Sequence, residues 1–95
     1  MLYLAFVRAK PAAAGTEVET LSRRWWNEGA RPEGVTTIAI YGSVGTSCPD
    51  VFVFDAATHD DIERVVQHWS AVADLDVHPA VDLADRFRQQ GMNVA

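Results

Sequence analysis

Hydrophobic residues follow two spacings along the chain, and together these spacings predict four strands and three helices. Two segments, Leu2–Arg8 and Val51–Phe54, are apolar at nearly every position, so both faces of each strand are apolar. Such strands are typical of a sheet that is covered on both sides. Two more strands are predicted at Val35–Tyr41, which is rich in β-branched residues, and at Leu75–Val81. Because Pro79 removes a ladder donor, the last of these strands is expected at an edge.

A first helix is predicted from Thr16 to about Glu28. Thr16 and Glu19 have the spacing of a capping box, and Gly29 ends the periodic run. Its apolar stripe comprises Val18, Leu21 and Trp25, with Ser22 beside the stripe and Trp26 on its flank.

A second helix is predicted after Thr58, a suitable N-cap that is followed by acidic residues. Its apolar stripe comprises Ile62, Val65, Val66, Trp69 and Val72. A short third helix is expected over Asp82–Gln90, closed by Gly91. The turn residues of Gly42–Pro49 predict a long hairpin loop between the second and third strands.

The resulting order, β-α-β-β-α-β plus a terminal helix, predicts an α+β fold of the ferredoxin-like type in one domain spanning residues 1–95. The four-stranded antiparallel sheet is expected in the order 4-1-3-2. That order places the two doubly apolar strands in the centre and the more polar strands at the edges.

Right-handed crossovers place both long helices on the same face of this sheet. The other face then carries either Leu2, Leu4 and Phe6 or Tyr3, Ala5 and Val7, and the terminal helix is too short to cover it. A large exposed apolar patch usually marks an interface, so a homodimer through this sheet face is expected. The alternative is a monomer whose C-terminal segment folds across the sheet.

Composition narrows the classes of partner. The 95 residues carry a net charge of −5 with a single lysine, which argues against nucleic-acid binding. No apolar run approaches the roughly 20 residues that span a bilayer, so no membrane partner is expected. One cysteine excludes an internal disulfide and fits a cytoplasmic location.

The element order, the size, the long hairpin and the passage Trp69-Ser70…Asp74-Leu75-Asp76-Val77…Pro79 together resemble the dimeric α/β-barrel superfamily. That superfamily includes antibiotic-biosynthesis-type monooxygenases, muconolactone isomerase-like proteins and small polyketide cyclases, and the chain looks closest to an uncharacterised branch. The resemblance implies a small-molecule pocket between the helices and the sheet of each subunit. No catalytic residues of that superfamily match positions of this sequence residue by residue.

Two residues are candidates for proton chemistry. His68 lies on the flank of the second helix, where an imidazole can face a cleft between helices and sheet and act as acid or base. Tyr41 ends the second strand and is a candidate hydrogen-bond partner. The simpler alternatives are a surface histidine and an edge-strand aromatic that packs beside the hairpin.

Four further residues are candidates for ligand binding. Trp25 and Trp69 lie centrally on their stripes, where core packing is the alternative. Trp26 is expected to line a pocket or to pack at the dimer interface, with plain core packing as the third alternative. Arg8 either pairs with a ligand carboxylate or marks the point where its strand reaches water.

The sequence predicts neither a metal site nor a cofactor. His59 and His68 point to opposite sides of one helix, and the pair Asp76 and His78 lacks a third ligand. Two functions remain open. One is a cofactor-independent enzyme, an isomerase, cyclase or monooxygenase acting on an apolar or aromatic metabolite. The other is a non-catalytic ligand-binding or structural homodimer.

Overall fold

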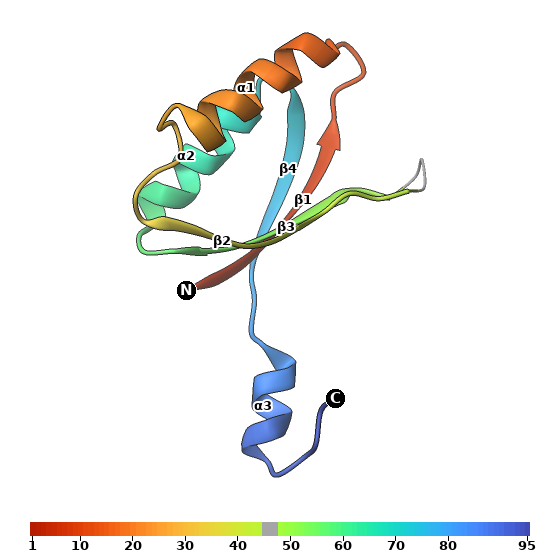
Figure 1. Ribbon diagram of the computed structural model, residues 1–95, viewed down its shortest axis with the longest axis vertical. Helices are drawn as coiled ribbons and strands as arrows, with labels where there is room; N and C mark the ends of the chain where they lie inside the picture. Colours follow the sequence, from red (N-terminus) through yellow and green to blue (C-terminus); the bar gives the residue numbers. More distant parts are fainter. Residues whose placement is uncertain (45–47) are drawn as a thin grey trace.

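The computed structural model describes residues 1–44 and 48–95, so residues 45–47 of the expected hairpin loop lie outside the described part. The elements are β1 (Leu2–Ala9), α1 (Gly15–Asn27), β2 (Val35–Tyr41), β3 (Asp50–Ala56), α2 (His59–Trp69), β4 (Ala73–Pro79) and α3 (Leu83–Gln89) (Figure 1). The strands form one antiparallel sheet in the order β2-β3-β1-β4. This is the predicted α+β architecture, with the doubly apolar strands β1 and β3 in the centre.

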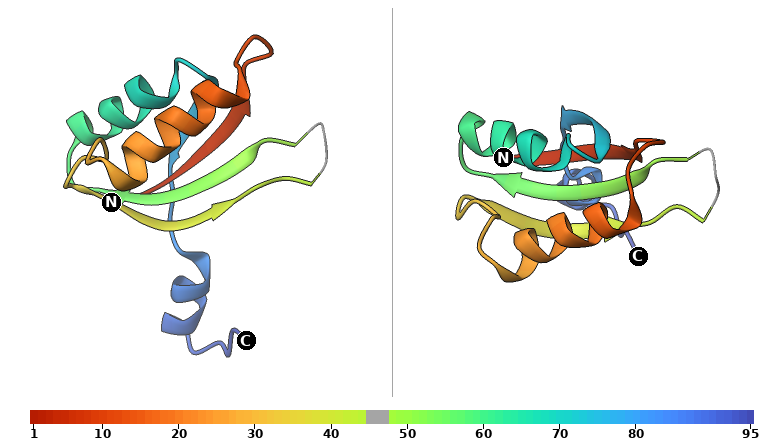
Figure 2. Two further views of the ribbon diagram at one scale, coloured as in Figure 1. Left: turned by 45° about the horizontal axis from the view of Figure 1, so that its top comes forward. Right: turned by 90° about the horizontal axis from the view of Figure 1, so that it is seen from above.

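Helices α1 and α2 lie side by side on one face of the sheet, as the handedness of the crossovers predicts (Figures 1 and 2). The residues that face them alternate along β1 and β3 and include Ala5, Phe52 and Phe54, all buried. We call this the covered face. The opposite face, here called the open face, carries Leu2, Leu4, Phe6, Val51 and Val53 along the same two strands, all of them partly exposed.

The core lies between the covered face and the two helices. Its largest fully buried side chains are Trp25, Phe54, Val35 and Val65, drawn from α1, β3, β2 and α2. The two central strands therefore contribute one of their faces to this core, and the helical stripes contribute the other layer.

The start of α2 is fixed by a reciprocal capping box. The Thr58 hydroxyl accepts a hydrogen bond from the Asp61 backbone N–H at 3.2 Å, and the Asp61 carboxylate accepts one from the Thr58 N–H at 3.1 Å. Asp61 is buried against Gly34, where an added Cβ would collide with its carboxylate. Gly34 therefore lets the loop before β2 approach the N-terminus of α2.

Other local expectations need correction. Helix α1 begins at Gly15 with Ala14 at the N-cap and no side-chain cap, so the predicted Thr16–Glu19 capping box does not form. Within the helix, the Thr16 carbonyl instead accepts a hydrogen bond from the Thr20 hydroxyl. Val72 lies beyond the end of α2, although it is buried, and β4 starts and ends two residues earlier than expected. The edge position of β4 is confirmed.

Helix α3 lies apart from this two-layer body. It extends from the end of β4 on the side of the open face and points away from the sheet (Figures 1 and 2). The chain therefore does not fold its own C-terminal segment across the open face. Among the described residues, no helix has the length and apolar character that crossing a membrane requires.

Candidate functional site

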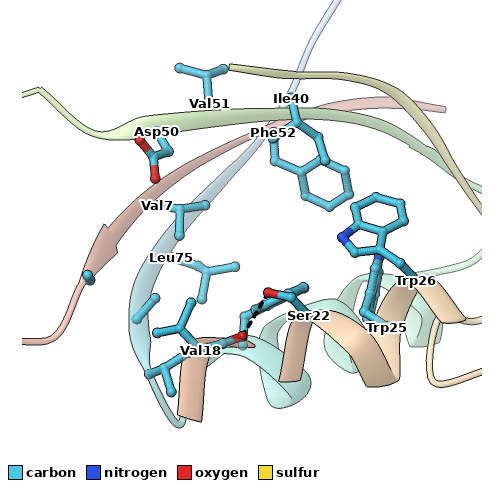
Figure 3. Close-up of a pocket in the computed structure, with 14 residues that line it drawn as sticks. Val7, Val18, Ser22, Trp25, Trp26, Ile40, Asp50, Val51, Phe52 and Leu75 are labelled. Carbon is cyan, nitrogen blue, oxygen red and sulfur yellow. Dashed lines mark hydrogen bonds between the residues drawn. The ribbon is translucent and has the colours of Figure 1, made fainter. Parts of the chain in front are cut away.

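A cavity of about 260 Å³ lies between α1 and the covered face of the sheet (Figure 3). Its walls come from α1, from all four strands, from the last residue of α2 and from the turn that follows. The lining residues are Val7, Ala9, Val18, Ser22, Trp25, Trp26, Ile40, Asp50, Val51, Phe52, Trp69, Val72, Ala73 and Leu75. The site is therefore an almost entirely apolar chamber under one helix.

All three tryptophans of the chain line this cavity. Trp25 is 1 % exposed and packs against Trp69 with ring centroids 5.6 Å apart, whereas Trp26 is 46 % exposed. Trp26 and Phe52 lie next to each other at one end of the cavity, and Val7, Val18 and Leu75 surround the other end (Figure 3). Aromatic walls of this kind accommodate flat apolar molecules by stacking and edge contacts.

Two polar side chains contribute to the lining. The Ser22 hydroxyl donates to the Val18 carbonyl at 2.8 Å, which leaves its oxygen lone pairs able to accept a hydrogen bond. Asp50, at the start of β3, accepts a hydrogen bond from the Ser43 backbone N–H at 3.0 Å. Among the described residues that line the cavity, Asp50 is the only one with an ionisable side chain. Polar chemistry within the cavity is therefore sparse.

The Trp25 indole N–H is buried and has no acceptor among the residues that the structure describes. An unsatisfied buried donor costs about 1–3 kcal/mol. Such groups are rare in folded proteins, and a functional role is one of their recurring explanations. The cavity wall at α1 therefore contains a buried donor, the Trp25 indole N–H, that has no hydrogen-bond partner among the described residues.

His68 does not line the cavity. Its Nε2–H donates to the Leu21 backbone carbonyl at 2.9 Å, and its ring packs on Trp25 with centroids 5.0 Å apart. The ring also meets Trp69 edge-on at a centroid distance of 4.8 Å. The imidazole thus joins α2 to α1 behind the tryptophan wall, so the expected opening of His68 into the cleft is not observed.

Tyr41 and Arg8 lie on the other side of the sheet. Tyr41 pairs with Val51 across β2 and β3 and is 65 % exposed, and Arg8 pairs with Asp74 across β1 and β4. Both positions belong to the open face, as the register shows. The structure therefore does not bring His68 and Tyr41 together in one site, and Arg8 faces away from the cavity that its neighbours Val7 and Ala9 line.

The three tryptophans that were expected at the site thus line the cavity together. Most of the aliphatic residues of its wall were not predicted from the sequence. Val7, Ile40 and Leu75 become wall residues because the sheet register turns them toward α1. Ser22 could have been predicted as a lining residue, because a small polar residue beside an apolar helical stripe leaves room next to large neighbours. Asp50 carried none, because its approach to α1 depends on the twist of the hairpin.

Metal ligation has little geometric basis in the described part of the chain. No group of three or more His, Cys, Asp or Glu side chains is placed to share an ion there. His78 and Asp76 lie 2.8 Å apart as an exposed pair on β4, and Cys48 is exposed near the hairpin loop.

The chain matches a protein family over most of its length. The family model described as "Domain of unknown function (DUF3303)" matches residues 1–89. No curated protein matches the chain at a significant level.

Proposed function

The chain belongs to this DUF3303 family, whose description assigns no activity, and we propose from its geometry that it is a small-molecule-binding homodimer. Each subunit holds an apolar or aromatic compound in the cavity between α1 and the sheet. The observation that carries this proposal is the cavity itself, walled by three tryptophans and Phe52.

The size and chemistry of the cavity define the class of ligand. Ligand pockets of proteins range from about 300 to 1,000 Å³, so a volume of 260 Å³ suits a compact flat molecule of one to three fused rings. The lining offers stacking surfaces and very few polar partners. A flat, neutral compound with few hydrogen-bonding groups fits these walls better than a sugar, a nucleotide or a peptide.

Binding without turnover is the favoured form of this function. Proton transfer by the expected His68–Tyr41 pair has no support, because the two side chains lie on opposite sides of the sheet. A catalytic variant of the proposal would depend on Asp50, the ionisable group of the lining.

The resemblance to the dimeric α/β-barrel superfamily supports the same location. The ferredoxin-like strand order and the two helices on one face agree with that resemblance, which implies a ligand between helices and sheet and a second subunit on the opposite face. The dimer also has an independent physical argument in the apolar centre of the open face.

Burying that centre against a second copy releases a large free energy. The exposed parts of Leu2, Leu4, Phe6, Val51 and Val53 form a continuous strip along the two central strands. At ~25 cal/mol per Å², each 100 Å² of this apolar surface that is buried contributes about 2.5 kcal/mol before the cost of association. Apart from Val51, which also borders the cavity, the strip lies on the face away from the cavity.

The binding proposal is tested by filling the cavity. Ser22→Leu adds bulk to the lining, and Thr20→Leu is its matched control, because each hydroxyl bonds the carbonyl four residues earlier at 2.8 Å and Thr20 lies outside the cavity. The probe is 1-aminoanthracene, a neutral flat fluorophore, titrated with tryptophan excitation. We expect Ser22→Leu to weaken its binding about tenfold or more and Thr20→Leu to leave it unchanged.

Equal binding by the wild type and Ser22→Leu would refute the cavity as the ligand site. Native mass spectrometry of the purified protein provides the identity of the ligand, since a bound apolar metabolite adds a discrete mass that Ser22→Leu removes.

A further inference from the structure

Helix α3 is an arm that its own chain leaves without a packing surface. The Cα radius of gyration is 15.0 Å, with a longest extent of 48 Å. A compact chain of this length is expected near about 12 Å. The difference reflects α3, which projects from the end of β4 on the side of the open face (Figure 1). No residue of α3, all of which the structure describes, is buried.

Capping interactions nevertheless stabilise α3 at both of its ends. The Asp82 carboxylate caps the first turn by accepting from the Asp85 N–H at 3.0 Å. At the other end, Gly91 has a φ of 84°, its N–H donates to Arg88, and the Met92 N–H donates to the Phe87 carbonyl, which together form a Schellman motif. A seven-residue helix is not stable alone in water, even with both caps, so α3 needs a surface to pack on.

One side of the arm is suited to such a surface. Leu83 and Phe87 lie one turn apart on the helix and are 53 % and 40 % exposed, and Val81 and Met92 extend the stripe at 58 % and 52 %. Arg86 and Arg88 lie beside Phe87 in the last turn. The arm therefore presents an apolar stripe with basic side chains next to it.

A complementary hollow exists on the β4 side of the open face. It has a volume of about 360 Å³ and is bounded by the apolar residues Phe6, Pro49 and Leu75, by the acidic residues Asp74 and Asp76, and by Arg8, which lies in register with Asp74. Its lining carries one carboxylate more than it has guanidinium groups, so an aromatic side chain flanked by arginines complements both its apolar part and its net charge. The arm of the same chain points away from the sheet (Figure 2).

We infer that α3 is an exchanged arm. In the proposed homodimer, on which this inference rests, the arm of each subunit crosses to the other and inserts Phe87 into the hollow beside Asp74 and Asp76. The exchange continues the sheet-to-sheet interface at its border, and it supplies α3 with the packing surface that its own chain lacks.

Limited proteolysis with trypsin distinguishes an exchanged arm from a free one. Cleavage after Arg86 and Arg88 is followed at a fixed trypsin ratio over a range of protein concentrations. We expect protection to rise with concentration and to follow the dimer fraction measured by sedimentation. Val53→Glu places a carboxylate in the centre of the open face and provides the monomeric reference, which is expected to be cleaved rapidly at every concentration.

Two substitutions on the arm complete the test. Phe87→Ala is expected to raise the dimer dissociation constant about tenfold or more, and Gln89→Ala, on the same helix, is expected to leave it unchanged. A wild-type dimer with concentration-independent protection would mean that α3 packs on its own chain. A wild-type dimer with no protection, unaffected by Phe87→Ala, would mean that the arm is free. Either result overturns the exchange while the dimer stands, whereas a monomeric wild type overturns both.

Discussion

Along the middle of β1 and β3, both faces of the sheet are apolar, but their surroundings differ entirely. Along β1 and β3, Ala5 and Phe54 on the covered face are fully buried, while their neighbours Leu4, Phe6 and Val53 on the open face remain partly exposed. The two helices cover the first set, whereas no described element covers the second. Strands that are apolar on both faces are therefore the basis for the proposed association.

The covered face is itself unevenly filled. Under α2, the core closes around Phe54 and Val65, which are 0 % exposed. Under α1, the helix is held away from the sheet by large rings, and the space between Trp26, Phe52 and Leu75 stays open as the cavity. The layer is therefore closely packed under α2 and leaves a cavity under α1.

The largest difference in stability is expected between the loss of a phenylalanine on the covered face and the loss of one on the open face. Phe54→Ala removes a fully buried ring and is expected to lower the free energy of unfolding by about 3–5 kcal/mol at every protein concentration. Phe6→Ala acts on the open face, so its effect should grow with the dimer fraction and fall in dilute protein to the smaller cost of losing a partly buried ring that contacts His78. Urea denaturation of both variants at several concentrations measures the difference. A Phe6→Ala effect that does not depend on concentration would contradict the assignment of that face to an interface.

A smaller effect is expected where a loop closes on α2 at the border of the covered face. Gly34→Ala directs a methyl group into the Asp61 carboxylate and is expected to destabilise the protein by about 1–3 kcal/mol. Gly15→Ala, where nothing lies within 4 Å of the added Cβ, is the control and is expected to be neutral or slightly stabilising. Thermal unfolding of the two variants distinguishes a close approach from a general cost of adding a side chain. Equal melting temperatures would argue against the contact.

The smallest effect concerns the imidazole behind the tryptophan wall. His68→Phe keeps a ring against Trp25 but removes the donor to Leu21, so a loss of about 0.5–1.5 kcal/mol is expected. Binding of 1-aminoanthracene should change little, because His68 does not line the cavity. Abolished binding with unchanged stability would instead place His68 in the ligand site.

The fold was largely predictable, because strand and helix periods are properties of the sequence itself. The doubly apolar strands were expected in the centre, and Thr58, followed by acidic residues, was expected to start a helix; both expectations are confirmed. Thr16 and Glu19 have the same spacing without the same outcome, because α1 begins at Gly15 and places Thr16 inside the helix. A local motif identifies a helix more reliably than it identifies the first residue of that helix.

The site was predictable only in part. Large aromatic residues on helical stripes face the sheet regardless of register, so Trp25 and Trp69 were found. The face on which Tyr41 lies depends on the irregular register between Thr37 and Ala39, and the sequence does not specify that irregularity. The contact of His68 with Leu21 depends on the spacing of two helices, which is set by tertiary packing rather than by either helix alone.

Sedimentation equilibrium of the full chain tests the central claim most directly, because the claim is that a second copy covers the open face. The account predicts a mass of twice the 10.4 kDa of one chain at micromolar concentration, reduced to a single chain by Val53→Glu. A wild-type mass of 10.4 kDa throughout the accessible concentration range would contradict it.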